Sequence, residues 1–176
     1  MKKINIFDLK FNNKEKNYFF KHSKKIFDEG FFSDHTYVKK FEQAFKKKYN
    51  CKYTLATSSG TSALEIILRA LEIKNKKVLV NSNTFIATGH AITNAGGEIV
   101  PVDLDMKYFL MSPEDLERKI NKRTGAVVIV HIGGMITPNI DKIIKICKKF
   151  NVPLVEDAAQ AQGSKYRGIY AGNFGT

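Results

Sequence analysis

The chain has 176 residues, of which 43% are hydrophobic, and its 13 Phe and 7 Tyr exclude an intrinsically disordered protein. The formal net charge is +12, but the basic residues are 25 Lys and only 4 Arg, whereas base-edge and bidentate phosphate contacts favour Arg. We therefore expect the charge to lie on solvated helix faces, and we expect no nucleic-acid partner.

No apolar run approaches the roughly 20 residues that a membrane span needs, and the first residues lack the apolar core of a signal peptide. We expect a cytoplasmic protein without a membrane anchor. Cys51 and Cys147 are too few for a disulfide framework, and the four histidines lack the spacing of a metal site. The expectation is two reduced thiols and no bound metal.

Residues 1–52 carry eight of the twelve net positive charges. Apolar residues recur at helical spacing within them, which predicts helices over residues 15–29 and 36–49. We interpret this part as an N-terminal helical arm, followed by a single α/β domain over residues 53–176.

Residues 53–176 alternate short β-branched runs with amphipathic segments, a pattern typical of a mostly parallel sheet flanked by helices. The expected strands are residues 77–80, 98–103, 125–132 and 152–157. The expected helices are residues 61–71, 85–94, 113–120 and 140–150. Ser112-Pro113-Glu114-Asp115 predicts a capping box at the start of the third of these helices, with Pro at its first position.

Small hydroxyl residues and one Gly precede the first of these helices, in the run Thr57-Ser58-Ser59-Gly60-Thr61-Ser62. A helix N-terminus offers unpaired N–H groups and the positive end of a dipole, so this run could hold a phosphate group. An ordinary Ser or Thr N-cap would have the same composition. The run is neither a Walker loop nor a Gly-x-Gly-x-x-Gly motif.

Two further segments lie at the carboxyl ends of expected strands, where ligands bind in open α/β sheets. Asp157 could hold a proton on a heterocyclic nitrogen and Gln160 could donate to a neighbouring oxygen, although Asp157 could equally cap the segment that follows it. Phe85 could stack on a flat ligand or belong to the core.

Five segments, taken together and in order, resemble the serial motifs of the DegT/StrS-type sugar aminotransferases. They are Ser59-Gly60-Thr61-Ser62-Ala63-Leu64, Thr84-Phe85-Ile86-Ala87-Thr88, Pro101-Val102-Asp103, Val130-His131-Ile132-Gly133-Gly134 and Glu156-Asp157-Ala158-Ala159-Gln160-Ala161-Gln162-Gly163. The resemblance extends from about Gly30 to Gly175. It implies the large domain of the aspartate aminotransferase fold, that of the fold type I enzymes, in truncated form.

The resemblance also implies pyridoxal 5'-phosphate as the cofactor and amino transfer from glutamate or glutamine to a nucleotide-linked keto sugar, by a homodimeric enzyme. Carried over to this sequence, Gly60 and Thr61 would hold the phosphate and Phe85 would stack on the pyridine ring. Asp157 would pair with the protonated ring nitrogen, and Gln160 would contact the phenolic oxygen. A carboxylate at the ring nitrogen favours the protonated ring, which is the electron sink of this chemistry.

The sequence departs from the family pattern in two places. Many members have His where this chain has Gln162. The family's Ser-Phe segment and its cofactor-binding Lys would begin a few residues after Gly175, and Lys165 does not match that position. We therefore expect the N-terminal part of such an enzyme, without the catalytic Lys and inactive by itself.

Other interpretations remain open at this point. The chain could be a non-catalytic relative that binds pyridoxal phosphate or a sugar nucleotide, or a structural partner of a longer paralogue. A related subset of the family carries out dehydration of the sugar, with His in place of the Lys. The family pattern places a further strand after Gly175. Without that strand its neighbour in the sheet would be unpaired, so we also expect the isolated chain to associate or aggregate.

Overall fold

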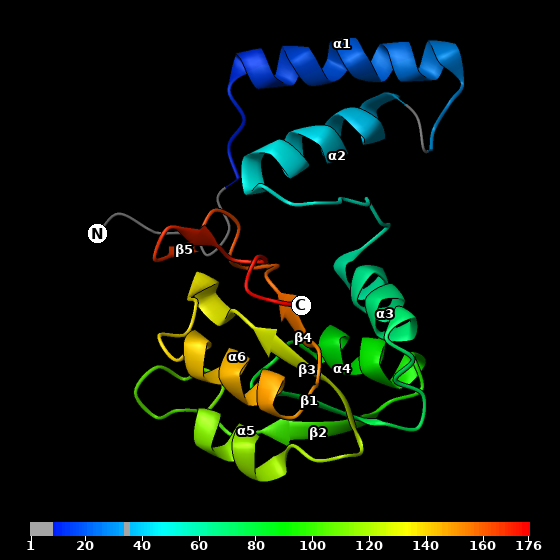
Figure 1. Cartoon of the computed structure of the whole chain (residues 1–176). Helices are drawn as coiled ribbons and strands as arrows, with labels where there is room; N and C mark the ends of the chain where they lie inside the picture. Colours follow the sequence, from blue (N-terminus) through cyan, green and yellow to red (C-terminus); the bar gives the residue numbers. More distant parts are fainter. Residues whose placement is uncertain (1–8, 34–35) are drawn as a thin grey trace. The chain divides into compact units, whose positions relative to one another are not determined.

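The computed structural model describes residues 9–33 and 36–176, and the chain divides into two compact units, Met1–Thr54 and Leu55–Thr176 (Figure 1). The first unit contains α1 (Asn13–Glu29) and α2 (Thr36–Tyr49), so both predicted helices are confirmed. The capping box at the start of α1 is a feature that the sequence analysis missed. The Asn12 side chain accepts from the Glu15 N–H at 2.9 Å, and Glu15 Oε2 accepts from the Asn12 N–H at 2.7 Å.

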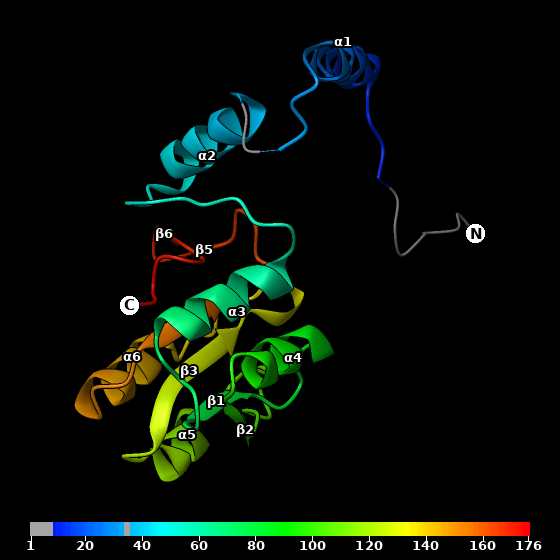
Figure 2. The ribbon, with the colours of Figure 1, turned by 90° about the vertical axis from the view of Figure 1, so that its right-hand side faces the viewer.

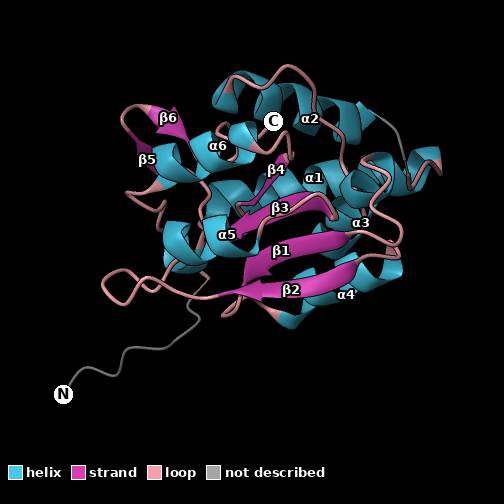
Figure 3. Ribbon diagram, turned by 60° about the horizontal axis from the view of Figure 1, so that its bottom comes forward, coloured by secondary structure: helices cyan, strands magenta, loops and turns pink. Residues whose placement is uncertain are grey.

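The second unit is built on a four-stranded parallel sheet with the strand order β2-β1-β3-β4 (Figure 3). The strands are β1 (Lys77–Asn81), β2 (Glu98–Val102), β3 (Thr124–Val130) and β4 (Leu154–Asp157). All four were predicted, and the parallel α/β fold is confirmed. β3 ends before Ile132, earlier than expected, because Gly133 and Gly134 turn the chain at φ 65° and 81°.

Helices cover both faces of the sheet (Figure 2). α3 (Gly60–Ala70) and α4 (Ile86–Asn94) pack on one face, and α5 (Pro113–Lys119) and α6 (Ile140–Lys149) pack on the other. The residues of the central strand β3 alternate between these faces. Val127 and Ile129 join the cluster against α5 and α6, and Val128 and Val130 join the cluster against α3 and α4.

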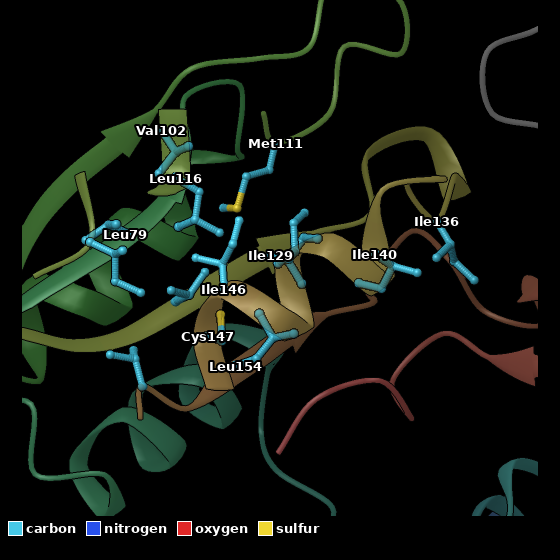
Figure 4. Close-up of a cluster of buried hydrophobic side chains, with 14 of the residues drawn as sticks. Leu79, Val102, Met111, Leu116, Ile129, Ile136, Ile140, Ile146, Cys147 and Leu154 are labelled. Atoms are coloured by element: carbon cyan, nitrogen blue, oxygen red, sulfur yellow. The ribbon is translucent and has the colours of Figure 1, made fainter. Parts of the chain in front are cut away.

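The cluster between the sheet and α5 and α6 contains Leu79, Leu116, Ile129 and Ile140, each at most 1% exposed (Figure 4). Ile140, Ile143 and Cys147 recur at helical spacing along α6, which gives that helix one apolar face. Burial of this face against β3 and β4 stabilises the sheet, and the carboxyl ends of its strands position the residues described below.

The capping box predicted at Ser112 does not close. Ser112 Oγ caps α5 by accepting from the Asp115 N–H at 3.2 Å, but the Asp115 carboxylate accepts from the Asp103 N–H at 2.7 Å instead of from Ser112. Asp115 is 7% exposed and also pairs with Arg118 and Lys119. Burial raises its pKa, but the Asp103 N–H and the two basic side chains outweigh burial and lower the pKa to about 2.

The chain after β4 forms a short antiparallel hairpin, β5 (Lys165–Tyr166) and β6 (Ile169–Tyr170), which the sequence analysis did not predict. It then returns to the edge of the sheet. The Thr176 N–H donates to Leu154 O and the Leu154 N–H donates to Thr176 Oγ1, each at 2.9 Å. The last residue therefore lies along β4.

Within residues 9–33 and 36–176, no helix combines the length and the apolar character needed to cross a bilayer. The same residues contain no group of three or more His, Cys, Asp or Glu side chains placed to bind a metal ion. Cys147 is buried and Cys51 is half-buried, and neither forms a disulfide.

Candidate functional site

The carboxyl ends of β1, β3 and β4 lie side by side. Val80 is in register with Val128, and Val130 is in register with Asp157. Asn81 ties β1 to β3 at this edge, because its fully buried amide donates to Val130 O and accepts from the Val130 N–H, both at 3.1 Å. The three strand ends thus form one fixed edge.

Asp157 ends β4 at this edge, and both of its carboxylate oxygens are held. Oδ1 accepts from the Ala159 N–H at 3.1 Å, and Oδ2 accepts from Thr88 Oγ1 at 3.2 Å. The bond to Ala159 closes a local turn, so Asp157 does cap the segment that follows it, although that segment is not a helix. Asp157 is half-buried, which leaves part of an oriented carboxylate open to a ligand.

Gln160 is exposed, and its amide is oriented by the turn that follows β3. Gln160 Oε1 accepts from the Gly133 N–H at 2.7 Å. A Cβ at Gly134 would lie 3.0 Å from Gln160 O, so this close approach favours glycine. With Oε1 occupied, the Nε2 group has no acceptor among the described residues and can donate to a ligand oxygen.

Phe85 is the N-cap residue of α4, four residues after β1 ends at Asn81, and its 68% exposure places it outside the buried core of this unit. Thr84, the residue before it, donates its hydroxyl to Thr88 Oγ1 at 2.8 Å. The loop that carries the exposed ring is therefore connected through Thr88 to Asp157.

α3 runs opposite to β1, which follows it after a short connection, so its amino end lies on the side of the sheet where the strands end. Ser59 caps the helix by accepting from the Ser62 N–H at 3.1 Å. The N–H groups of Gly60 and Thr61 have no acceptor among the described residues. A Cβ at Gly60 would meet no atom within 4 Å, so the space outside this turn is open. These are the features of an anion site at a helix N-terminus.

Glu156 precedes Asp157, and the alternation of side chains along β4 directs it to the opposite face of the sheet. Oε2 accepts from His131 Nε2 at 2.9 Å and from the Gly172 N–H at 2.8 Å, and Oε1 accepts from the N–H groups of Phe174 at 2.5 Å and Gly175 at 2.6 Å. Burial raises the pKa of Glu156, but the bonds from His131 and from the backbone outweigh it and lower the pKa. This cluster was missed, because its members lie far apart in the sequence.

The arrangement fits the chemical groups of pyridoxal 5'-phosphate. Unpaired N–H groups at the α3 terminus suit a phosphate, and the exposed Phe85 ring suits a flat heterocycle. The oriented Asp157 carboxylate suits a protonated ring nitrogen, and the free Gln160 amide suits a phenolate oxygen. Each of these groups lies at or near the carboxyl edge of the sheet, where α/β folds bind ligands.

Comparison with known proteins gives one consistent family. The model of the DegT/DnrJ/EryC1/StrS aminotransferase family matches residues 13–176. The chain is 38% identical over 140 residues to GDP-perosamine synthase of Escherichia coli O157:H7, an alignment that covers 79% of the chain and 38% of that relative. The chain thus spans about 38% of the length of curated relatives that it matches.

Solved structures agree in fold. The S. venezuelae DesV structure superposes with a TM-score of 0.85 at 29% identity, covering 89% of this chain and 42% of DesV. The E coli GDP-4-keto-6-deoxy-D-mannose-3-dehydratase, solved with hydrated PLP, superposes with a TM-score of 0.80 at 26% identity, covering 89% of this chain and 42% of that enzyme.

Proposed function

Because the chain belongs to the DegT/DnrJ/EryC1/StrS aminotransferase family, we propose that it is the pyridoxal-phosphate-binding part of an enzyme that transfers an amino group from glutamate or glutamine to a nucleotide-linked keto sugar. The observation that carries the proposal is the Asp157 carboxylate, fixed through both oxygens at the carboxyl edge of the sheet. The chain is a partial homologue of sugar-nucleotide aminotransferases, so the activity of the whole enzyme is inferred from its relatives.

The roles of the residues follow from their chemistry. The N–H groups of Gly60 and Thr61 bind the phosphate at the positive end of α3, and Phe85 covers one face of the ring. Asp157 holds a proton on the ring nitrogen, and Gln160 Nε2 donates to the phenolic oxygen. When bound, the cofactor supplies the electron sink for removal of a proton from the amino acid.

The direct test is binding of pyridoxamine 5'-phosphate to the full chain, followed by fluorescence. This probe has an amine in place of the aldehyde, so it cannot react non-specifically with the 25 lysines. We expect saturable one-to-one binding. Asp157→Asn should retain much of this binding but weaken it about tenfold, because Asn keeps a hydrogen-bonding group at the ring nitrogen and loses the charge that stabilises the ring proton.

The matched control is Asp141→Asn. Asp141 is an exposed carboxylate in the first turn of α6, on the face of the sheet opposite to α3 and α4, and it pairs with Arg167 at 2.8 Å. We expect this variant to bind like the wild type. Absence of saturable binding, or equal affinity of the Asp157→Asn variant and the wild type, would overturn the proposal.

Sugar dehydration is a second candidate reaction, favoured by the similarity to the E coli dehydratase. Both reactions use the same cofactor, so binding of the probe does not separate them. In the family, the residue that distinguishes the two reactions lies beyond the position that matches Thr176. Assay of a protein that contains both this chain and the family segment with that residue, with a keto sugar nucleotide and glutamate as substrates, would separate an amino product from a deoxy product.

We further propose that the protein acts in the cytoplasm as a homodimer, with residues 1–52 as a helical arm and residues 53–176 as the cofactor-binding domain. The first unit supports a docking role, because large aromatic side chains such as Phe20 and Phe27 are 66% and 71% exposed on α1. Light scattering of the full chain measures the mass directly. A monodisperse monomer would contradict both the dimer and the expected association at the edge of the sheet.

A further inference from the structure

We propose that Thr88 is a positioning residue which, with Thr84 behind it, holds the Asp157 carboxylate in the orientation that meets the ring nitrogen of the cofactor. The inference rests on the proposed function and extends it to residues that touch no cofactor atom. Thr84 Oγ1 lies 2.8 Å from Thr88 Oγ1, which in turn lies 3.2 Å from Asp157 Oδ2. Thr88 is 2% exposed, so water does not compete for its hydroxyl.

The direction of this hydrogen-bond chain follows from the chemistry of its end. An ionised carboxylate only accepts, so Thr88 must donate its single proton to Asp157. The lone pairs of Thr88 are then left to accept, and the Thr84 hydroxyl donates to them. Each bond polarises the next, and the bond to the carboxylate is charge-assisted. With the Ala159 N–H on the other oxygen, the carboxylate plane is fixed from two sides.

A second threonine on the same helix shows that this use of the hydroxyl is particular to Thr88. Thr93, near the end of α4, directs its hydroxyl to carbonyl groups of its own helix, at 3.3 Å from Gly89 O and 3.0 Å from His90 O. That is the usual bond of Ser and Thr within helices. Thr88 instead bonds across to β4, to a residue 69 positions away. Thr93 therefore provides a matched control.

The hydroxyl chain also joins two parts of the site. Thr84 directly precedes Phe85, the exposed ring at the start of α4, and Asp157 ends β4. The position of the loop that carries the ring and the orientation of the carboxylate are therefore set through the same buried hydroxyl. A change at Thr88 should disturb the ring nitrogen without removing any group that contacts the cofactor.

The test compares Thr88→Val, Thr88→Ser and Thr93→Val in the full chain, with pyridoxamine 5'-phosphate labelled with ¹⁵N in the ring. Val keeps the shape of Thr and removes the donor, whereas Ser keeps the donor. We expect Thr88→Val to weaken binding about two- to tenfold, because the Asp157 side chain is then ordered only when the probe binds, and to shift the ring ¹⁵N resonance toward the neutral pyridine. Thr88→Ser and Thr93→Val should match the wild type in both readouts.

A cofactor-free readout separates this inference from the proposed function. The ¹³Cγ resonance of Asp157, assigned with Asp157→Asn, reports the hydrogen bonds of its carboxylate directly. If the wild type binds no probe, the proposed function fails, and the role of Thr88 is decided by this resonance alone. A shift in Thr88→Val that is absent in Thr88→Ser and Thr93→Val supports the role, and an unchanged resonance overturns it.

Thermal unfolding of each variant shows whether the fold is retained. If Thr88→Val does not fold, Thr84→Val takes its place, because it removes the second donor from a half-buried position and leaves Thr88 intact. We expect it to move the ¹³Cγ resonance in the same direction by a smaller amount. No movement in a folded Thr84→Val variant would overturn the role of the hydroxyl chain.

Discussion

Substitution of Glu156 tests whether one buried carboxylate holds the end of the chain against the sheet. The side chain is 2% exposed and accepts four hydrogen bonds, from His131 Nε2 and from the N–H groups of Gly172, Phe174 and Gly175. Glu156→Ala removes all four acceptor positions. Glu156→Gln keeps one oxygen and the shape but removes the charge.

The expected magnitude follows from what the substitution leaves behind. Loss of one partner of a buried pair costs about 3–5 kcal/mol, since the other partner stays buried without compensation. The N–H groups of Gly172 and Gly175 are near solvent, so water can replace part of their loss. We therefore expect Glu156→Ala to lower the free energy of unfolding by about 3–5 kcal/mol, and Glu156→Gln by about 1–3 kcal/mol.

The assay is urea unfolding at pH 7 together with amide hydrogen exchange, and Glu117→Gln is the control. Glu117 pairs with Lys149 at 2.7 Å on the surface, where the two side chains are 48% and 64% exposed, and such pairs contribute at most about 1 kcal/mol. Exchange at Phe174 and Gly175 should accelerate in both Glu156 variants and not in the control. A Glu156→Ala variant within about 1 kcal/mol of the wild type, with unchanged exchange at these amides, would refute the reasoning.

The pH dependence of the same carboxylate has a definite sign. Burial opposes ionisation of Glu156, but its hydrogen bonds outweigh burial, and its pKa in the folded protein is lowered. The folded state therefore binds fewer protons than the unfolded state in the acid range. The contribution of Glu156 is complete above the ordinary pKa of a glutamate and is lost as pH falls through the lowered value. The stability difference between wild type and Glu156→Gln should shrink accordingly in acid.

Three further predictions concern other parts of the second unit. Asp115, whose pKa is about 2, should contribute at most about 2 kcal/mol above pH 4, lost as pH falls toward 2, so the unfolding free energies of wild type and Asp115→Asn should converge in acid. Burial raises the pKa of Cys147 to about 11, so we expect iodoacetamide to modify it only as fast as the chain unfolds, measured by mass spectrometry. A Cβ at Gly175 would lie 2.8 Å from Leu154 O, a backbone atom, so Gly175→Ala should release Thr176 from β4 and accelerate exchange of its amide.

The layers of the fold were predictable because each is encoded by local periodicity. The apolar run of β3 and the helical recurrence of Ile140, Ile143 and Cys147 each state which surfaces are buried, without reference to distant residues. The ends of elements were less predictable. β3 stops early because of two glycines with positive φ, and the α5 box stays open because the Asp115 carboxylate accepts from the backbone N–H of Asp103 in the preceding loop.

The residues of the candidate site also differ in whether the sequence alone predicts them. Asp157, Gln160 and Phe85 could be selected because their residue types stand at the ends of predicted strands or within a few residues after them. Thr88 and His131 could not be assigned roles, because each acts through one bond to a residue on a distant strand. The sequence does contain a local signal for Thr88, because it is a polar residue on the apolar face of a short helix. That signal does not identify the hydrogen-bond partner of Thr88, which only the tertiary fold shows.

Adjacent carboxylates at the end of β4 show why residue order at this point matters to function. Side chains of a strand alternate between its two faces, so Glu156 lies with the α5 and α6 layer and Asp157 lies with the α3 and α4 layer. Glu156 has four donors around it and no capacity left for a ligand, whereas Asp157 has two and remains half-buried. Glu156 fixes the chain around it, and Asp157 stays available to a ligand. Because the two residues are consecutive, the hydrogen bonds of Glu156 also hold the backbone that carries Asp157. A register shift of one residue would exchange the two environments, which is how the two-fold period of the strand selects Asp157 as the residue that can meet a cofactor.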